Sequence, residues 1–203
     1  MPPAFFLRMA YHHGDLRRAL LQGALELLAE GGPPALTLRG AARRAGVSPA
    51  APYRHFTDKR ELMAAVAEEG FLALDRHAEE EIERAGSDAA QRFRCHGLAY
   101  VRYAIDHPAH YRVMFGPEIP DKRLYAALDA ASRAAYDRLR DSIRACQQAG
   151  VIPDGDIEHR AVRAWALVHG LASLFIDGQL AGTAATDRDS FLEMVDTIFS
   201  SSH

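Results

Sequence analysis

The sequence from residue 36 to residue 62 decides the fold: it reads Leu36-Thr-Leu-Arg-Gly-Ala-Ala-Arg-Arg-Ala-Gly-Val-Ser-Pro-Ala-Ala-Pro-Tyr-Arg-His-Phe-Thr-Asp-Lys-Arg-Glu-Leu62. Thr37 is a favourable N-cap for a first short helix. Gly46 supplies the permissive backbone that a tight turn between two helices needs. Ser48 as a cap, with Pro49 at the first helical position, predicts a second short helix. The pattern is typical of a helix-turn-helix, which presents its second helix to the major groove of DNA.

Other residues of the stretch fit this interpretation. Ala41 and Ala42 are small, so a second helix can approach them closely. Pro52 removes an early backbone donor, and we therefore expect the second helix to be short and partly 3₁₀-like. Asp58 and Glu61 can form a capping-box-like pair at the start of a long helix that follows.

Helical periodicity extends over the rest of the chain. Apolar residues recur at helical spacing, and no alternating run bounded by turns indicates a sheet. One such run is Leu124, Leu128, Ala131, Ala135 and Leu139, which we expect to face inward. The sequence therefore predicts an all-α protein. Its expected helices cover about residues 15–30, 38–45, 49–55, 58–85, 88–107, 109–115, 124–149, 157–177 and 188–200.

Charge is distributed unevenly along the chain. Residues 1–60 carry nine basic and four acidic residues, a net charge of +5, whereas the remainder carries 15 basic and 23 acidic residues, a net charge of −8. This distribution of charge is typical of a protein whose basic N-terminal part binds a polyanion and whose acidic remainder does not.

Composition places the chain among ordinary globular proteins, with 48% hydrophobic and 25% charged residues. The two cysteines, Cys95 and Cys146, belong to no metal-ligand spacing and favour a reducing cytoplasm over a disulfide framework. The longest apolar stretch, about residues 164–176, is shorter than the roughly twenty residues that a membrane span needs. We therefore expect a cytoplasmic protein with no membrane partner.

The helix-turn-helix stretch also resembles the DNA-binding signature of the TetR family of transcriptional regulators. That signature is a Thr-started helix, then Gly-Val-Ser, then a short helix ending in Tyr-x-His-Phe, then a Lys at the start of a long helix. Here the corresponding residues are Thr37, Gly46-Val47-Ser48, Tyr53-Arg54-His55-Phe56 and Lys59, at the expected spacing.

The resemblance implies a role for each of these positions. Tyr53, His55 and Lys59 would contact phosphates, which positions the protein without reading the DNA sequence. Phe56 would belong to the core. The full set of DNA-binding residues that the resemblance implies is Thr37, Arg39, Ser48, Pro49, Ala50, Ala51, Tyr53, Arg54, His55 and Lys59.

The positions expected to face the bases are small and apolar. Ala50 and Ala51 can touch thymine methyl groups but cannot form bidentate hydrogen bonds. Sequence preference would then depend on Arg39, Arg54, Ser48 and the shape of the DNA.

Purely structural interpretations remain open for several of these residues. Tyr53 can instead pack beneath the long helix, and His55 can donate to a backbone carbonyl at the surface. Arg43, Arg44 and Arg60 fit a solvated basic face better than specific contacts.

The C-terminal part resembles one branch of the same family. Trp165, His169 and Gly170 form a Trp-x-x-x-His-Gly segment, and residues 107–115 and 11–16 also match that branch. In the family the last two helices pair with their copies in a four-helix dimer interface, and Gly170 allows a close helix approach. The interface residues expected here are Leu167, Gly170, Leu171, Leu174, Phe191, Met194, Val195 and Ile198.

The resemblance further implies a ligand cavity among the central helices. An inducer bound there would reorient the long helix and spread the two DNA-binding heads. Aromatic residues on a helix are also ordinary core, and His169 is equally a hydrogen-bonded structural residue. The expected lining is Phe71, Phe93, Tyr100, Tyr103, Met114, Phe115 and Trp165.

These inferences predict three segments and one function. Residues 1–10 form a flexible tail rather than a signal peptide, and Met9 serves as a start as well as Met1. Residues 11–57 form the DNA-binding domain, and residues 58–203 form the ligand-binding and dimerisation domain. We expect a homodimeric repressor that binds a palindromic or pseudopalindromic double-stranded operator and is released by a small-molecule inducer.

Three other classes of protein compete with this prediction. No nucleophile motif, phosphate-binding glycine loop or metalloprotease motif indicates an enzyme, so we expect no catalytic residue, metal or cofactor. A metal sensor needs more ligands than His107 and His110, with His77 and His96 as candidates by type alone. A redox sensor is disfavoured because Cys95 and Cys146 fall on predicted inward faces, where thiols are usually inert. A structural adaptor leaves the basic head and the Gly-Val-Ser turn unexplained.

Overall fold

The computed structural model describes residues 13–200. The expected tail over residues 1–10 lies outside the described residues, as do Tyr11 and His12. Within residues 13–200 the secondary structure is entirely helical, which confirms the predicted fold class. By its internal contacts the chain forms two compact units that divide between Val66 and Ala67, and each is described separately below.

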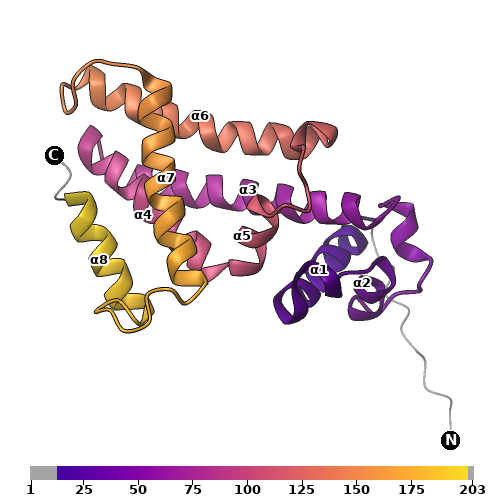
Figure 1. Ribbon diagram of the computed structural model, residues 1–203. Helices are drawn as coiled ribbons and strands as arrows, with labels where there is room; N and C mark the ends of the chain where they lie inside the picture. Colours follow the sequence, from indigo (N-terminus) through magenta and orange to yellow (C-terminus); the bar gives the residue numbers. More distant parts are fainter. Residues whose placement is uncertain (1–12, 201–203) are drawn as a thin grey trace, which may run out of the picture. The chain divides into compact units, whose positions relative to one another are not determined.

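The first unit contains α1 (His13–Ala35), α2 (Leu38–Arg44), the 3₁₀ helix η1 (Ala51–Arg54) and the first turns of α3 (Lys59–Arg84) (Figure 1). The helical path of α1 is interrupted at Gly31 (φ −145°) and Gly32 (φ 63°). The predicted stop after Glu30 is therefore confirmed, because Gly32 adopts a backbone conformation that other residues avoid.

Helices α1 and α2 pack unusually closely. A Cβ atom added at Gly23 of α1 would lie 2.8 Å from the carbonyl oxygen of Ala41. A Cβ added at Gly40 of α2 would lie 2.8 Å from Thr37 Oγ1 and 3.0 Å from Leu27 Cδ1. Gly23 thus lets the backbone of α1 approach that of α2, and Gly40 leaves room for the side chain of Leu27. The buried alanines of α2 keep the rest of this contact close.

The turn between α2 and η1 follows the sequence prediction. Thr37 caps α2, with its hydroxyl accepting a hydrogen bond of 2.9 Å from the Gly40 amide. Gly46 has a φ of 67°, and the Val47 amide donates to the carbonyl of Ala42 at 3.0 Å. The positive φ of Gly46 and the hydrogen bond from Val47 together form a C-terminal cap that ends α2.

The start of the second short helix differs from the prediction. The helix begins at Ala51 rather than Pro49, and Ser48 makes no side-chain cap. Pro52 has no N–H to donate to the Ser48 carbonyl, and the Ala51 amide takes that carbonyl instead at 2.9 Å. The expected 3₁₀ character is confirmed, because this i−3 bond is the 3₁₀ pattern.

The second unit contains the remainder of α3, α4 (Ala89–Asp106), α5 (Pro108–Phe115), η2 (Lys122–Leu124), α6 (Ala126–Gln148), α7 (Ile157–Ile176) and α8 (Arg188–Ser200). Helix α4 is its centre and packs against α5, α6, α7 and α8 (Figure 1). Among the helices of residues 13–200, none combines the length and apolar character needed to cross a membrane.

One predicted inward residue is exposed. Leu124 lies in η2, before α6 begins, and is 75% exposed. The helical period of α6 therefore starts at Leu128, which is buried together with Ala131 and Ile143. Expecting Leu124 to face inward was wrong because the helix begins two residues later than its period suggested.

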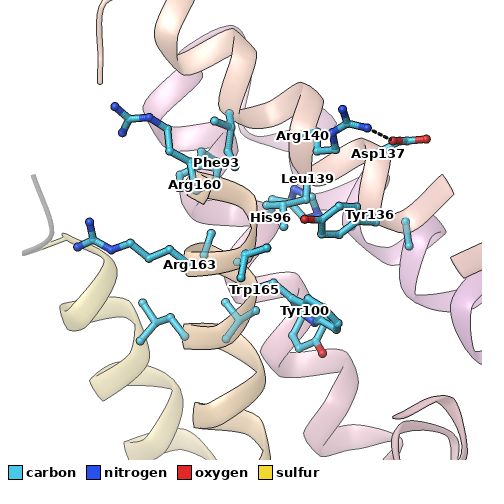
Figure 2. A pocket seen from close by; sticks show the side chains of 18 of the residues that line it. Phe93, His96, Tyr100, Tyr136, Asp137, Leu139, Arg140, Arg160, Arg163 and Trp165 are labelled. Atoms are coloured by element: carbon cyan, nitrogen blue, oxygen red, sulfur yellow. Dashed lines mark hydrogen bonds and ion pairs between the residues drawn. The ribbon is translucent and has the colours of Figure 1, made fainter. Parts of the chain in front are cut away.

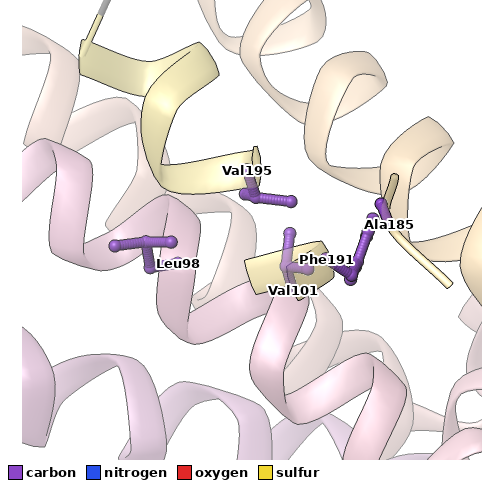
Figure 3. Packing of buried hydrophobic residues seen from close by; sticks show 5 residues of the cluster. All are labelled: Leu98, Val101, Ala185, Phe191 and Val195. Atoms are coloured by element: carbon purple, nitrogen blue, oxygen red, sulfur yellow. The ribbon is translucent and has the colours of Figure 1, made fainter. Parts of the chain in front are cut away.

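A solid core lies between α4 and α8 (Figure 3). Phe191 and Val195 of α8 are fully buried against Leu98 and Val101 of α4. The ring of Phe191 also stacks on Phe175, with centroids 4.4 Å apart. Because Phe191 and Val195 have no exposed surface, we remove them from the expected dimer interface.

Candidate nucleic-acid interface and ligand cavity

Exposed cations gather on the helix-turn-helix unit. Arg39, at the start of α2, and Arg54, at the end of η1, are both exposed. In the described part of the chain neither forms an ion pair, and the same holds for Arg43 and Arg60. Arg44 differs, because its guanidinium is held by the carboxylates of Glu30 and Glu26. Positive charge without an internal partner is available to a polyanion.

The aromatic groups of η1 differ in accessibility. Tyr53 is 54% exposed and is therefore not packed into the core. His55 is half-buried beside Phe56, with ring centroids 6.2 Å apart, and Phe56 is in the core as expected. The Nε2 atom of His55 is buried and lacks a hydrogen-bond partner among the described residues.

The small residues before and within η1 are accessible. Ser48, Pro49 and Ala50 are exposed, and Ala51 is half-buried. Pro52, by contrast, is fully buried and anchors the short helix. The surface that the resemblance assigns to base contacts is therefore present but offers few hydrogen-bonding groups.

The start of α3 is tied to the end of α1. The Lys59 ammonium donates to the carbonyl oxygen of Pro33 at 2.6 Å, a contact that the sequence did not indicate. An ammonium has three donors, so this bond leaves two for a phosphate, and the expected phosphate contact stays a prediction.

The predicted capping pair forms with a change of partner. Asp58 accepts from the Glu61 amide at 2.9 Å, as a capping box requires. Glu61 does not return to Asp58 but accepts from the amide and hydroxyl of Thr57, at 2.6 and 2.7 Å. These two hydrogen bonds lower the pKa of the Glu61 carboxyl.

The second unit contains a cavity of about 1040 Å³ that is partly open to solvent (Figure 2). Five of the residues expected to line it do so: Phe71, Phe93, Tyr100, Phe115 and Trp165. Figure 2 shows Tyr100 and Trp165 in this wall together with Tyr136 and His96. The sequence missed the polar side of the lining, because helical spacing does not show which polar residues turn inward. The missed polar residues include Asp75, Arg94, His96, Lys122, Arg133, Tyr136, Arg140, Glu158, Arg160 and Arg163.

Tyr103 and Met114 do not line the cavity. Met114 is 1% exposed and would contact any Cβ added at Gly70 of α3, so it fills the space between those helices. Tyr103 is buried beside His107, with ring centroids 4.7 Å apart. Both are core residues, as the alternative interpretation of helical aromatics allowed.

A hydrogen-bonded group of residues lies behind the cavity wall. The Nδ1 atom of His169 lies 3.0 Å from the Tyr100 hydroxyl and 2.9 Å from the Tyr111 hydroxyl. The Tyr111 hydroxyl also lies 2.8 Å from Ser173 Oγ. Burial lowers the pKa of His169 and raises the pKa of Tyr100, so all these groups are neutral near pH 7. The placement fits the interpretation of His169 as a hydrogen-bonded structural residue.

His96 is a second buried histidine and lines the cavity itself. Its Nδ1 atom lies 3.1 Å from Ser142 Oγ. Burial lowers the pKa of His96 to about 4, with the positive charge of Arg138 acting in the same direction. The nearby Arg138 is held by Asp75 through two hydrogen bonds of 2.5 and 3.0 Å. His96 therefore presents a neutral imidazole to the cavity at pH 7.

Helix α7 presents an apolar face to solvent. Leu167 and Leu174 are 41% and 43% exposed, and a Cβ added at Gly170 would meet no atom within 4 Å. The expected interface residues Leu171, Met194 and Ile198 are half-buried. Leu171 and Met194 also pack against the core cluster of this chain.

The candidate ligands for a metal are dispersed. In residues 13–200 no three His, Cys, Asp or Glu side chains are grouped as a metal site. Cys146 is buried, which raises the pKa of its thiol, and Cys95 is half-buried.

Comparison with known proteins identifies the family. The sequence profile described as "Bacterial regulatory proteins, tetR family" matches residues 20–66. The profile described as "Tetracyclin repressor-like, C-terminal domain" matches residues 93–198. No curated protein matches the chain significantly.

Solved structures share the fold of this chain. A protein of unknown function from Rhodococcus sp. RHA1 is 36% identical, covers 95% of this chain and 97% of its own, and has a TM-score of 0.80. The TetR-family regulator PfmR from Thermus thermophilus is 22% identical over 89% of this chain and 94% of its own, with a TM-score of 0.69. The regulator FadR from Bacillus subtilis, solved in complex with stearoyl-CoA, is 15% identical over 92% of this chain and 98% of its own, with a TM-score of 0.74. The chain therefore belongs to the TetR family and is a transcription regulator with a helix-turn-helix DNA-binding domain.

Proposed function

We propose that this chain is a ligand-responsive repressor that binds a palindromic or pseudopalindromic operator as a homodimer. A small-molecule inducer bound in the cavity of the second unit would release it from DNA. The observation that carries this proposal is the cavity of about 1040 Å³ in a protein whose other unit is a helix-turn-helix. A space of this size is large enough for a ligand of ordinary cofactor or drug size.

The DNA contacts follow from the exposed groups of the first unit. Within the described residues Arg39 and Arg54 form no ion pair, and Tyr53 is an exposed side chain. In this proposal Arg39 reads a base edge, and Tyr53, His55 and Lys59 contact phosphates. A regulator with this role acts in the cytoplasm, where it meets DNA.

The homodimer is proposed on the exposed apolar face of α7. Leu167 and Leu174 are 41% and 43% exposed, and the open side of Gly170 lies on the same helix. An apolar face interrupted by a glycine suits close packing against a copy of itself around a two-fold axis. A dimer of this kind presents two heads to half-sites one helical turn or more apart. This helix also contains the Trp-x-x-x-His-Gly segment, by which the chain resembles one branch of the family, and we include membership of that branch in the proposal.

A gel-shift experiment tests the DNA-binding part of the proposal. The probes are DNA from upstream of the gene and random DNA of equal length, each measured over a range of salt concentrations. We expect the Arg39→Ala variant to lose about 1–3 kcal/mol of affinity for the upstream DNA if Arg39 reads a guanine. Arg123→Ala, which removes an exposed charge in the second unit, is the matched control.

Each outcome of the gel shift has a defined meaning. An equal loss on both DNA probes shows that Arg39 contacts a phosphate rather than a base. Absence of binding at low salt, or binding that does not weaken as salt rises, contradicts the proposed DNA-binding function.

A further inference from the structure

Lys122 occupies an unusual place in the wall of the cavity. It lies in η2, the short helix between α5 and α6, and is one of the residues that line the cavity. Its Nζ atom lies 5.8 Å from the centroid of the Phe71 ring, which lines the cavity as well. A half-buried ammonium is thus positioned against an aromatic face in the cavity wall.

The Lys122 ammonium has no counter-charge. Among the residues that the structure describes, no carboxylate lies within ion-pairing distance of it. The carboxylate of the adjacent Asp121 is paired with Arg123, whose guanidinium donates two hydrogen bonds to it, of 2.8 and 2.9 Å. Burial alone lowers the pKa of Lys122, with no neighbouring carboxylate to oppose the shift.

Most of the other cations around the cavity are already paired. Arg133 is held by Asp129 at 2.8 Å, Arg140 by Asp137 at 3.0 Å, and Arg94 by Asp196. Arg160 donates to the carbonyl oxygen of Pro153 at 2.8 Å, and Arg163 is exposed on α7. Arg160 is half-buried as well and has no carboxylate partner in the described residues, but its guanidinium is engaged by that carbonyl. Lys122 has neither a carboxylate nor a hydrogen-bond acceptor among the described residues, so its charge is available to a ligand in the cavity.

An aromatic wall leads away from Lys122. The ring of Phe71 meets Phe115 edge to face, with centroids 5.4 Å apart. Phe115 lies 6.3 Å from Tyr100 and 6.1 Å from Trp165, and Trp165 lies 6.0 Å from Tyr136. A molecule that placed its polar end at Lys122 would find a continuous apolar surface for the rest of its length.

We propose that the inducer is an anionic amphiphile. This inference rests on the proposed function, in which the cavity binds the inducer. Its anionic group pairs with the Lys122 ammonium, and its apolar body lies along Phe71, Phe115 and Trp165. A carboxylate, a sulfonate and a phosphate ester share the chemistry that an ammonium recognises. A neutral molecule of the same shape would leave the ammonium without a partner.

Two fluorescent dyes of nearly equal shape test the proposal on the full chain. 8-Anilinonaphthalene-1-sulfonate carries an anionic group, and N-phenyl-1-naphthylamine is the same ring system without it. We expect the wild-type protein to bind the sulfonate more tightly. Lys122→Gln should weaken sulfonate binding by about tenfold or more while leaving the neutral dye unchanged, because it removes a charge-assisted hydrogen bond.

Two further variants serve as controls. Arg144→Gln removes one exposed positive charge of α6 that does not line the cavity, and it should change neither dye's affinity. Lys122→Arg keeps the charge at the position and should retain the preference for the sulfonate. Lys122→Arg also keeps the proposal testable if Lys122→Gln fails to fold.

The outcomes separate this proposal from the proposed function. If the wild type binds both dyes but Lys122→Gln weakens neither selectively, the anionic preference is wrong and the cavity still binds ligands. If neither dye binds the wild type, the cavity is not a ligand site and both proposals fail. Displacement of the sulfonate dye by dodecanoate or by dodecyl phosphate supports the inference and distinguishes a carboxylate from a phosphate. Equal displacement by dodecanol overturns it.

Discussion

The two units of this protein pack by opposite means. In the helix-turn-helix unit, α1 and α2 approach so closely that Gly23 and Gly40 have no room for a methyl group. In the second unit, large side chains separate the helices, and a cavity of about 1040 Å³ remains among them. Backbone-to-backbone packing holds a surface in one geometry, as a DNA-reading surface requires. Packing through large side chains leaves volume that a ligand can occupy.

The largest expected effect comes from comparing a residue of the solid core of the second unit with a residue of its cavity wall. Phe191→Ala removes a fully buried ring that stacks on Phe175, and we expect the free energy of unfolding to fall by about 3–5 kcal/mol. Phe93→Ala removes a half-buried ring that already borders the cavity, so its cost should be less than half as large. Urea unfolding of both variants measures this, and equal losses would contradict the distinction between core and cavity.

A pH titration of stability tests whether the cavity wall depends on a neutral histidine. The pKa of His96 falls from 6.5 to about 4 on folding, so the unfolded chain binds a proton first as the pH drops. The free energy of unfolding should therefore decrease between pH 6.5 and pH 4, by up to roughly 3 kcal/mol, and this group should contribute nothing above pH 6.5.

A variant isolates this contribution from that of His110, whose pKa burial also lowers to about 4. His96→Asn should lose its own part of the pH dependence, whereas His159→Asn, at an exposed position of α7, should keep the wild-type profile. Identical profiles for wild type and His96→Asn would show that His96 is accessible to protons in the folded state.

The smallest of the three effects lies in the helix-turn-helix unit. Gly23→Ala places a methyl group 2.8 Å from the carbonyl oxygen of Ala41, and a backbone atom cannot rotate away. The strain should exceed the gain in helix propensity and destabilise the protein by about 1–2 kcal/mol. Thermal unfolding measures this, with Gln22→Ala on the exposed side of the same helix as control. A more stable Gly23→Ala variant would show that the close approach of α1 and α2 is not required.

The sequence predicted local backbone features best. The Thr37 cap and the left-handed Gly46 were both predicted, because each depends on the chemistry of one residue and its near neighbours. The start of η1 was predicted two residues early, because Pro49 and Pro52 each suit the first turn of a helix and the sequence does not show which one occupies it. In the structure Pro52 does, after the hydrogen bond from the Ala51 amide to the Ser48 carbonyl.

What covers each helix face was harder to predict. Periodicity identifies the apolar side of a helix but not whether a core, a cavity or a second chain lies against it. Phe191, Tyr103 and Met114 lie in this chain's own core, whereas Phe115 and Trp165 border the cavity. The contact of Lys59 with Pro33 was equally inaccessible, because it joins residues 26 positions apart.

The two amines described above are also the only lysines of the sequence, Lys59 and Lys122. One is bound to a carbonyl at the start of α3, and the other lies in the cavity wall. An amine-selective reagent therefore has one side-chain target in each unit of the protein. Mass spectrometry of the two labelled peptides would follow DNA binding and ligand binding as separate signals in a single sample, without any engineered probe.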